Sequence, residues 1–345
     1  MRHLLPILAA LLAPFAAQAQ TPPRSPACRM VGDVPARDGT PHFIHLDPAA
    51  TGRLAAIGLD RAEIFARMAD TSIPETTGCW AMPAGNFDGQ LISVGMAQWN
   101  YGTGSLQPVL MRWRDGHRSR GAFKRELKVL APLHGRLLLS RDCLAVPVRD
   151  KCRRRILAEQ DVAGKLSPTL AAELTAIFES ETMLAVQAGT YVELLEEVRG
   201  ELLRMFPAGP ITLRKVRWAI DIKVQQGSFP GDDDIARLRR KLAAMPEGER
   251  WPRLRAIVDW YRALAESIDQ DGIGRDYRWN VEKWGCLIDR GRIDPEQYEL
   301  LNLTFLRSRT ATGNAGRWQA LTFSRRAKIV LGVGSVSGVR DGDCA

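Results

Sequence analysis

Residues 72–108 read S-I-P-E-T-T-G-C-W-A-M-P-A-G-N-F-D-G-Q-L-I-S-V-G-M-A-Q-W-N-Y-G-T-G-S-L-Q-P. Two carboxylates, Glu75 and Asp88, lie on either side of a segment rich in glycine and proline, and hydroxyl, amide and aromatic side chains follow. Asp88-Gly89 is the strongest turn signal in the chain. Short apolar segments flank it, so the pattern predicts a β-hairpin there.

Helix signals surround this hairpin. Asp60, with Glu63 three residues later, is typical of a capped helix start, and Ile64, Phe65 and Met68 supply an apolar face. The residue before a proline is disfavoured in a helix, so the pattern predicts that this helix ends before Pro74.

The rest of the chain also reads as helices, and the predicted fold class is α+β, predominantly helical. Ser167-Pro168 and Asp294-Pro295 each place an N-cap before a proline. Apolar periodicity predicts further helices near 190–206, 212–226, 233–244, 252–269, 295–309 and 315–331. The acidic run Asp232, Asp233 and Asp234 suits the positive end of a helix better than a calcium loop.

The first 19 residues are typical of a secretory signal, with an apolar run from Leu4 to Ala17 and a small-residue cleavage site ending at Ala19. We therefore expect a soluble protein in the periplasm or outside the cell. Residues 20–50 are expected to form an extended arm, 51–160 a lobe that carries the hairpin, and 161–345 a helical second lobe.

Six cysteines, an even number, predict three disulfides in an oxidising compartment. The only pairing that spacing favours is Cys143 with Cys152, and Cys344 is expected to tie down the tail that begins at Gly332. Histidine and cysteine spacings typical of zinc sites are absent from the sequence, as are phosphate-binding and dinucleotide-binding glycine loops. We expect no metal and no cofactor.

The formal net charge is +9, and loss of Arg2 with the signal would leave +8. Basic residues concentrate in two stretches, 112–128 and 149–155. Solvated faces are the preferred interpretation of these stretches, over contacts with a glycan or nucleic acid. The overall basicity still favours an acidic polymer as partner. Aromatic residues do not interleave with the charges, so a nucleic-acid partner is not expected.

Cleavage of a glycosidic bond requires one protonated carboxyl group and a second, ionised carboxylate. Glu75 suits the acid role, because apolar neighbours such as Trp80 would reduce its hydration. Asp88 suits the role of base or charge stabiliser, and Ser93 could hold the attacking water. A separation of about 6.5–9.5 Å between the two carboxyl groups would indicate inversion at the anomeric carbon.

Two parts of this segment resemble known families. The pattern from Asp88 to Ser105 resembles chitosanases, in which a catalytic Asp-Gly is followed by a water-positioning hydroxyl, here Ser93, and a glycine-rich turn. The pattern S-x-G-x-x-Q, from Ser93 to Gln98, is similar to goose-type lysozymes and lytic transglycosylases, which implies Glu75 as the acid. Residues 219–227, A-I-D-I-K-V-Q-Q-G, look like the buried second-lobe helix of bacterial proteins that carry the N-F-D-G-Q and Q-W-N motifs.

These resemblances imply a lysozyme-like, two-lobed architecture with the hairpin beside a catalytic cleft. The expected function is hydrolysis of peptidoglycan between amino sugars. The side chains expected to contact sugar are Trp80, Gln98, Trp99, Asn100, Tyr101 and Thr103. Taken singly, the aromatic residues would more often belong to a core, and Asp88 to a turn.

Several alternatives stay open. A chitosanase-like enzyme or a lytic transglycosylase would use the same fold, and a wall-binding protein would keep the fold without the chemistry. Chitosan is the less favoured substrate, because a polycationic chain is repelled by a basic protein. No integral membrane contact is expected, since no stretch after the signal is apolar enough.

Overall fold

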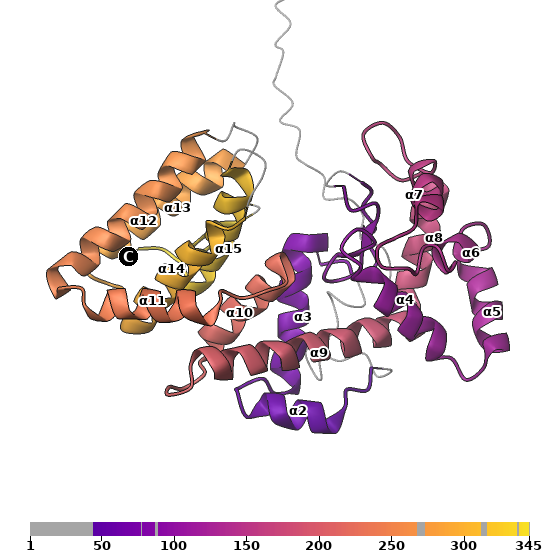
Figure 1. Ribbon diagram of the computed structural model, residues 1–345, viewed down its shortest axis with the longest axis horizontal. Helices are drawn as coiled ribbons and strands as arrows, with labels where there is room; N and C mark the ends of the chain where they lie inside the picture. Colours follow the sequence, from indigo (N-terminus) through magenta and orange to yellow (C-terminus); the bar gives the residue numbers. More distant parts are fainter. Residues whose placement is uncertain are drawn as a thin grey trace, which may run out of the picture.

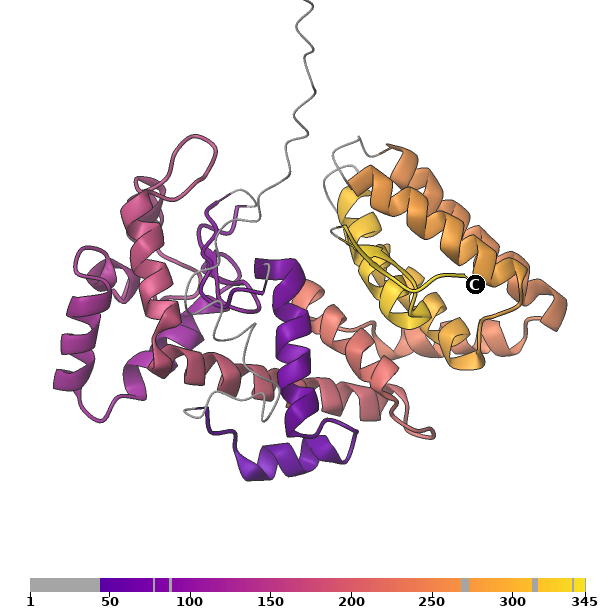
Figure 2. The same cartoon turned by 180° about the vertical axis from the view of Figure 1, so that it is seen from behind.

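The computed structural model describes residues 44–76, 78–86, 89–267, 273–311, 316–336 and 338–344. In this part of the chain the protein is predominantly helical, with two small antiparallel sheets of two strands each. The helical part of the predicted fold class is thus confirmed. Figures 1 and 2 show two groups of helices, α2–α9 and α10–α15, with α9 and α10 running where the groups meet.

The helices of the first group pack around α9. Helices α2, α3, α4 and α8 all pack against α9, which makes it the central support of this half of the molecule. The elements are α2 Pro48–Ala55, α3 Arg61–Thr76, β1 Ser93–Val94, β2 Trp99–Asn100, α4 Leu106–Asp115, α5 Arg120–Leu130, α6 Gly135–Leu138, α7 Asp150–Leu157, α8 Pro168–Glu179 and α9 Glu181–Met205.

The second group packs around an aromatic core. Tyr261, Tyr277, Trp284 and Phe323 stack with ring centroids 5.1 to 5.8 Å apart. The elements are α10 Leu213–Gln226, α11 Asp232–Ala243, α12 Glu247–Ser267, α13 Ile273–Asp289, α14 Pro295–Ser308, α15 Arg317–Leu331, β3 Gly334–Val336 and β4 Val339–Asp341. The helices predicted in this half are all present, whereas α13 and the β3–β4 hairpin were not predicted.

The predicted helix caps are confirmed at three starts. The Asp60 carboxylate accepts from Glu63 N at 2.8 Å, and Ser167 Oγ accepts from Leu170 N at 3.3 Å. Asp294 forms a complete capping box at the start of α14. These short-range signals are reliable because the cap satisfies backbone donors that no helical carbonyl can reach.

The predicted end of α3 was wrong, because the helix continues through position 74 to Thr76. Proline lacks the amide hydrogen of its own nitrogen and disfavours the helix there, but other hydrogen bonds hold the last turn. Thr76 Oγ1 and Gly78 N both donate to the carbonyl of Ser72, at 2.9 and 3.1 Å. Glu75 therefore lies in the last turn of α3.

One antiparallel bridge, between Ala84 and Ser93, joins the segments on either side of the predicted Asp88-Gly89 turn, and a second pairing that was not predicted follows it. Asp88 lies outside the described residues, and the described hairpin pairs β1 with β2, with Ser93 opposite Asn100. Its turn is residues 95–98, where Gly95 supplies a φ of +88°. The bridge between Ala84 and Ser93 adds a third segment beside it.

The segment between Ala84 and Ser93 is fixed by the loop that joins α7 to α8. Asn86 N donates to Gly164 O at 2.9 Å, and Gln160 Nε2 donates to Leu91 O at 2.8 Å. A Cβ atom at Gly85 would lie 1.8 Å from the Gly164 carbonyl oxygen, so only glycine fits there. The expected boundary between residues 160 and 161 lies in this same loop.

Disulfides fix the outer parts of the fold. The predicted Cys143–Cys152 bond is confirmed, and a Cys286–Cys344 bond ties the tail to α13 as expected. Cys79 is also disulfide-bonded. The expected signal, the arm up to residue 43 and Cys28 lie outside the described residues.

Helix α2 begins at Pro48, inside the segment expected to be extended, because the Asp47 carboxylate accepts from Ala49 N and caps it. Across the described ranges, no helix combines the length and apolar character that crossing a membrane requires.

Candidate functional site

Glu75 lies where the two helix groups meet. Its side chain is 15% exposed, and Oε1 accepts hydrogen bonds from two helices of the second group. Gln225 Nε2 of α10 donates at 2.9 Å, and Arg325 Nη1 of α15 donates at 2.8 Å. The end of α3 is thereby joined to α10 and α15 through one carboxylate oxygen.

Asp221 of α10 is a buried carboxylate that also binds Arg325. It is 6% exposed and accepts from Arg325 Nε at 2.8 Å and from Arg326 Nε at 3.0 Å. Arg326 is fully buried, and its Nη1 donates to Gln226 Oε1 at 2.7 Å. We call these residues the inter-helix network: Glu75, Asp221, Gln225, Gln226, Arg325 and Arg326.

The sequence of α10 explains how one helix supplies half of the network. Asp221 and Gln225 are four residues apart and so lie on the same helix face. Gly227, with a φ of +69°, ends the helix directly afterwards in the left-handed conformation. This helix and its C-cap include residues 219–227, the segment expected to form a buried helix, and its polar residues make the contacts.

Two cations and two anions balance one another in the network. Burial lowers the pKa of Arg325, but the charges of Asp221 and Glu75 outweigh burial and raise it above its usual value. Burial lowers the pKa of Arg326 to about 10, although Asp221 opposes this. Both guanidinium groups stay charged at neutral pH, so Asp221 and Glu75 are held as their counter-ions.

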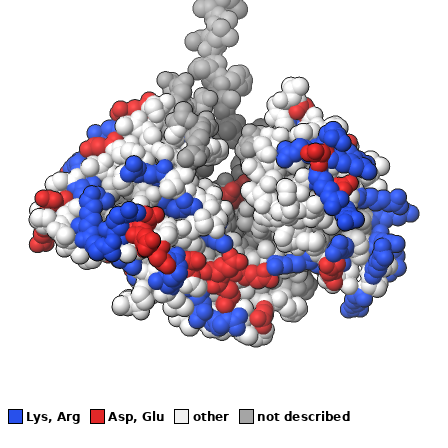
Figure 3. All heavy atoms as spheres, viewed as in Figure 1, with Lys and Arg blue, Asp and Glu red and all other residues white. Residues whose placement is uncertain are grey.

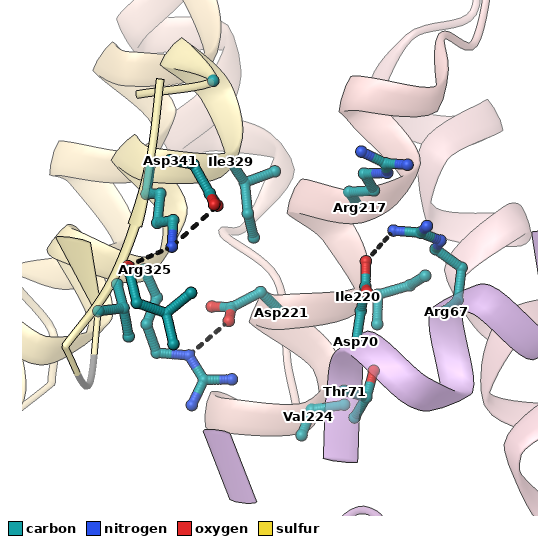
Figure 4. A pocket seen from close by; sticks show the side chains of 14 residues that line it. Arg67, Asp70, Thr71, Arg217, Ile220, Asp221, Val224, Arg325, Ile329 and Asp341 are labelled. Atoms are coloured by element: carbon teal, nitrogen blue, oxygen red, sulfur yellow. Dashed lines mark hydrogen bonds and ion pairs between the residues drawn. The ribbon is translucent and has the colours of Figure 1, made fainter. Parts of the chain in front are cut away.

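A pocket of about 400 Å³ opens beside the network, between α3, α10, α15 and the β3–β4 hairpin (Figure 4). Asp221 and Arg325 form part of its wall. Its other charged side chains are paired: Arg67 with Asp70 at 2.5 Å, Lys328 with Asp341 at 2.9 Å, and Arg217 with Glu63 at 3.5 Å. The remaining lining side chains are Thr71, Ile220, Val224, Ile329, Val336 and Val339. Glu75 is not part of this wall, so the pocket and the Glu75 carboxylate share the Asp221–Arg325 pair.

The aromatic residues expected to contact sugar are buried. Trp80, Trp99 and Tyr101 are 2%, 8% and 0% exposed. Tyr101 Oη donates to Leu138 O at 2.8 Å, and burial raises its pKa. In this structure the three rings pack in the core of the first group.

The polar residues of the hairpin make local contacts. Asn100 Oδ1 accepts from both the backbone nitrogen and the hydroxyl of Thr103, at 2.8 and 2.9 Å. Gln98 Nε2 donates to Met82 O at 3.3 Å. Ser93 is 3% exposed and bonds through its backbone to Ala84. The structure thus gathers Ser93, Gln98, Asn100 and Thr103 on one hairpin and the turn that follows it.

Of the predicted site residues that the structure describes, Glu75 is the one that contacts the second helix group. Its contacts with Gln225 and Arg325 were not predicted. Gln225 and Asp221 lie in a segment already singled out, but Arg325 and Arg326 were not. A pair of adjacent arginines in the middle of a largely apolar helix was the available signal, because such a pair has to be solvated or bonded to acids. Among the described residues, no cluster of histidine, cysteine or carboxylate side chains suits a metal ion.

Comparison with models of known protein families, with curated proteins and with solved structures finds no match for this chain.

Proposed function

We propose that the protein is an exported glycan hydrolase of the lysozyme-like class, cleaving peptidoglycan between amino sugars with Glu75 as the general acid. The observation that carries the proposal is the position of the Glu75 carboxyl group. It lies on the last turn of α3 where the two helix groups meet, it is partly exposed, and it directly precedes the segment that resembles catalytic segments. A two-lobed, lysozyme-like arrangement is part of the same proposal.

Arg325 has a definite role in this mechanism. Its Nη1 donates to Glu75 Oε1 at 2.8 Å, whereas a general acid has to donate a proton to the leaving oxygen. We therefore expect a bound glycan to displace the guanidinium from Glu75, while Asp221 keeps Arg325 in place. Glu75 would then take up the proton that it delivers to the leaving oxygen.

Asp88 and Ser93 complete the proposed chemistry. Asp88, outside the described residues, is proposed as the base or charge stabiliser, and Ser93 as the group that holds water. Gln98, Asn100 and Thr103, on the same hairpin, would contact the sugar chain. The buried rings of Trp80, Trp99 and Tyr101 would support this hairpin from the core.

Export is proposed on the basis of the N-terminal signal and the cysteines. The two described disulfides and the bonded Cys79 suit the periplasm or the cell exterior, because cytosolic thiols are kept reduced.

A non-catalytic glycan-binding protein is the second candidate, and the Glu75–Arg325 ion pair is the observation that favours it. Arg325 forms an ion pair with the Glu75 carboxylate, and this contact holds α3 against α15 whether or not Glu75 acts as an acid. This candidate predicts that the protein binds peptidoglycan without shortening it.

The decisive experiment measures clearing of a peptidoglycan suspension by the purified protein. Glu75→Gln removes the ionisable group while keeping a side chain that accepts from Arg325 and Gln225, and we expect clearing to fall by at least about a hundredfold. The matched control is Glu63→Gln. Glu63 is on the same helix and also pairs with an arginine, Arg67, at 2.9 Å. Full clearing by Glu75→Gln would refute the acid role.

Product analysis separates the related enzymes. A hydrolase leaves a reducing sugar, a lytic transglycosylase leaves an anhydro sugar, and a chitosanase shortens chitosan oligomers in preference to peptidoglycan. Binding of peptidoglycan with none of these products would favour the second candidate.

A further inference from the structure

The basic charge of the protein is concentrated at one end. Residues 114–155 contain thirteen Lys and Arg against four Asp and Glu, a net charge of +9 that equals the formal net charge of the whole chain. Figure 3 shows these side chains gathered over α5 and α7, at the end of the molecule away from α11–α15. The two basic stretches of the sequence thus form one region, which we call the basic end.

Most of these cations have no counter-ion in the part of the chain that the structure describes. Arg114 pairs with Asp115 and Arg149 with Asp142. Within that part, no ion pair forms with the others, which are exposed: Arg118, Arg120, Lys124, Arg125, Lys128, Arg136, Arg141, Lys151, Arg153, Arg154 and Arg155. In the second helix group, some cations, such as Arg237 and Arg239, do pair with acids.

Helix stability does not account for the charges on α5. Arg120, Lys124 and Lys128 follow one another at four-residue spacing, where like charges repel. Arg120 lies at the positive end of the helix, and the first turn contains no acid. Lys128 lies in the last turn, where a cation is favoured, so the unfavourable positions are Arg120 and Lys124, and a negatively charged partner would offset their repulsion.

Exposed aliphatic side chains lie on the same helix faces as the cations. Val129 is 79% exposed and shares a face of α5 with Arg125, four residues earlier. Leu157 is 39% exposed and shares a face of α7 with Arg153 and Arg154. The phosphate backbone of a nucleic acid, which attracts exposed cations, gives no apolar contact to these side chains. The headgroup region of a bilayer accepts both cations and aliphatic groups.

We propose that the basic end docks on the surface of a bilayer that contains anionic phospholipids. The outer faces of α5 and α7 place their lysines and arginines among lipid phosphates, and Val129 and Leu157 enter the interfacial layer. The contact is peripheral and leaves Glu75, at the junction of the helix groups, free to face another partner. It does not depend on Glu75 being catalytic.

The test is co-sedimentation of the full exported chain with vesicles of phosphatidylcholine alone or mixed with phosphatidylglycerol. We expect binding only to the mixed vesicles. The combined change Lys124→Gln, Arg125→Gln and Lys128→Gln should lower the partition coefficient on the order of a hundredfold, because each cation near an anionic surface contributes separately. The matched control, Arg237→Gln, Arg240→Gln and Lys241→Gln on α11, removes the same charge and should bind as before.

A second pair of changes tests the choice of partner. Val129→Ser with Leu157→Ser leaves the charge unchanged and should still weaken vesicle binding, whereas a pure polyanion contact would not respond. Circular dichroism and the melting temperature verify that each variant is folded. The proposal fails if both vesicle types bind equally, if the α11 control loses as much binding, or if only double-stranded DNA retains the protein.

Discussion

Asp221 is the residue on which the charges of the inter-helix network converge. It is almost fully buried and is the acceptor for both Arg325 and Arg326. Removing one member of a buried ionic cluster leaves the others uncompensated in a poorly solvated interior. Its contribution to stability should therefore be far larger than that of a carboxylate paired at the surface.

We expect Asp221→Asn to lower the free energy of unfolding by about 3–5 kcal/mol, because two arginines would lose their shared counter-ion. The matched control is Asp341→Asn. Asp341 pairs with Lys328 at 2.9 Å but its side chain is 60% exposed, so its loss should cost no more than about 1 kcal/mol. Urea unfolding followed by circular dichroism measures both. Equal effects of the two substitutions would contradict the structural importance of the network.

The start of α8 shows how much a single cap can contribute to a helix. Ser167 Oγ accepts from Leu170 N and donates to the Glu159 carboxylate at 2.8 Å. This hydrogen bond, helped by His134, lowers the pKa of Glu159. The Ser167 side chain therefore connects the start of α8 to the Glu159 carboxylate in the preceding loop, and its effect on stability should depend on the protonation of Glu159.

Ser167→Ala should destabilise the protein by about 1 kcal/mol at neutral pH, the usual effect of losing an N-cap. A carboxylate with a lowered folded-state pKa contributes stability above its unfolded pKa and loses it as the pH falls. The difference between the variant and the unmodified protein should therefore shrink as the pH falls below about 4. Thermal unfolding at neutral and acidic pH measures this, and a pH-independent difference would show that Glu159 is not involved.

Local signals predicted the helices well, and longer-range contacts account for the failures. The caps at Asp60, Ser167 and Asp294 depend on neighbouring residues, so their pattern is visible in the sequence. The β1–β2 pairing and the backbone contact of Asn86 with Gly164, far along the chain, were not predicted, because no local pattern signals them.

The candidate site was only partly predictable for the same reason. Glu75 was predicted as a site residue because it lies near a segment that resembles catalytic segments of glycan hydrolases. Arg325 was not, because helical periodicity does not distinguish an arginine in solvent from one bonded across the molecule. The end of α3 was missed because hydrogen bonds to Ser72 hold a turn that Pro74 alone would weaken.

The five tyrosines of the chain report on the whole molecule. Burial is the main cause that raises the pKa of each, and Tyr277 reaches about 12. A raised folded-state pKa means that stability is complete below the unfolded value near 10 and is lost as the pH rises above it.

Tyrosine absorbance near 295 nm should therefore stay low in the folded protein as the pH passes about 10. Most of the rise should then come in one cooperative step together with loss of helix signal, because unfolding exposes the four buried phenols of Tyr101, Tyr191, Tyr261 and Tyr277. The unfolded protein in concentrated guanidinium is the control and should titrate near its ordinary pKa. A gradual rise while the helices persist would show that the rings are accessible to solvent.

The sequence distance between the partners of Glu75 has a consequence for folding. Glu75 bonds to residues that follow it by 150 and 250 positions. Helices form from neighbouring residues within microseconds, whereas contacts between remote segments must first close long loops. The inter-helix network therefore cannot exist while either helix group is still unfolded. A newly made chain could be rich in helix and still lack its candidate site until the last of the three helices docks.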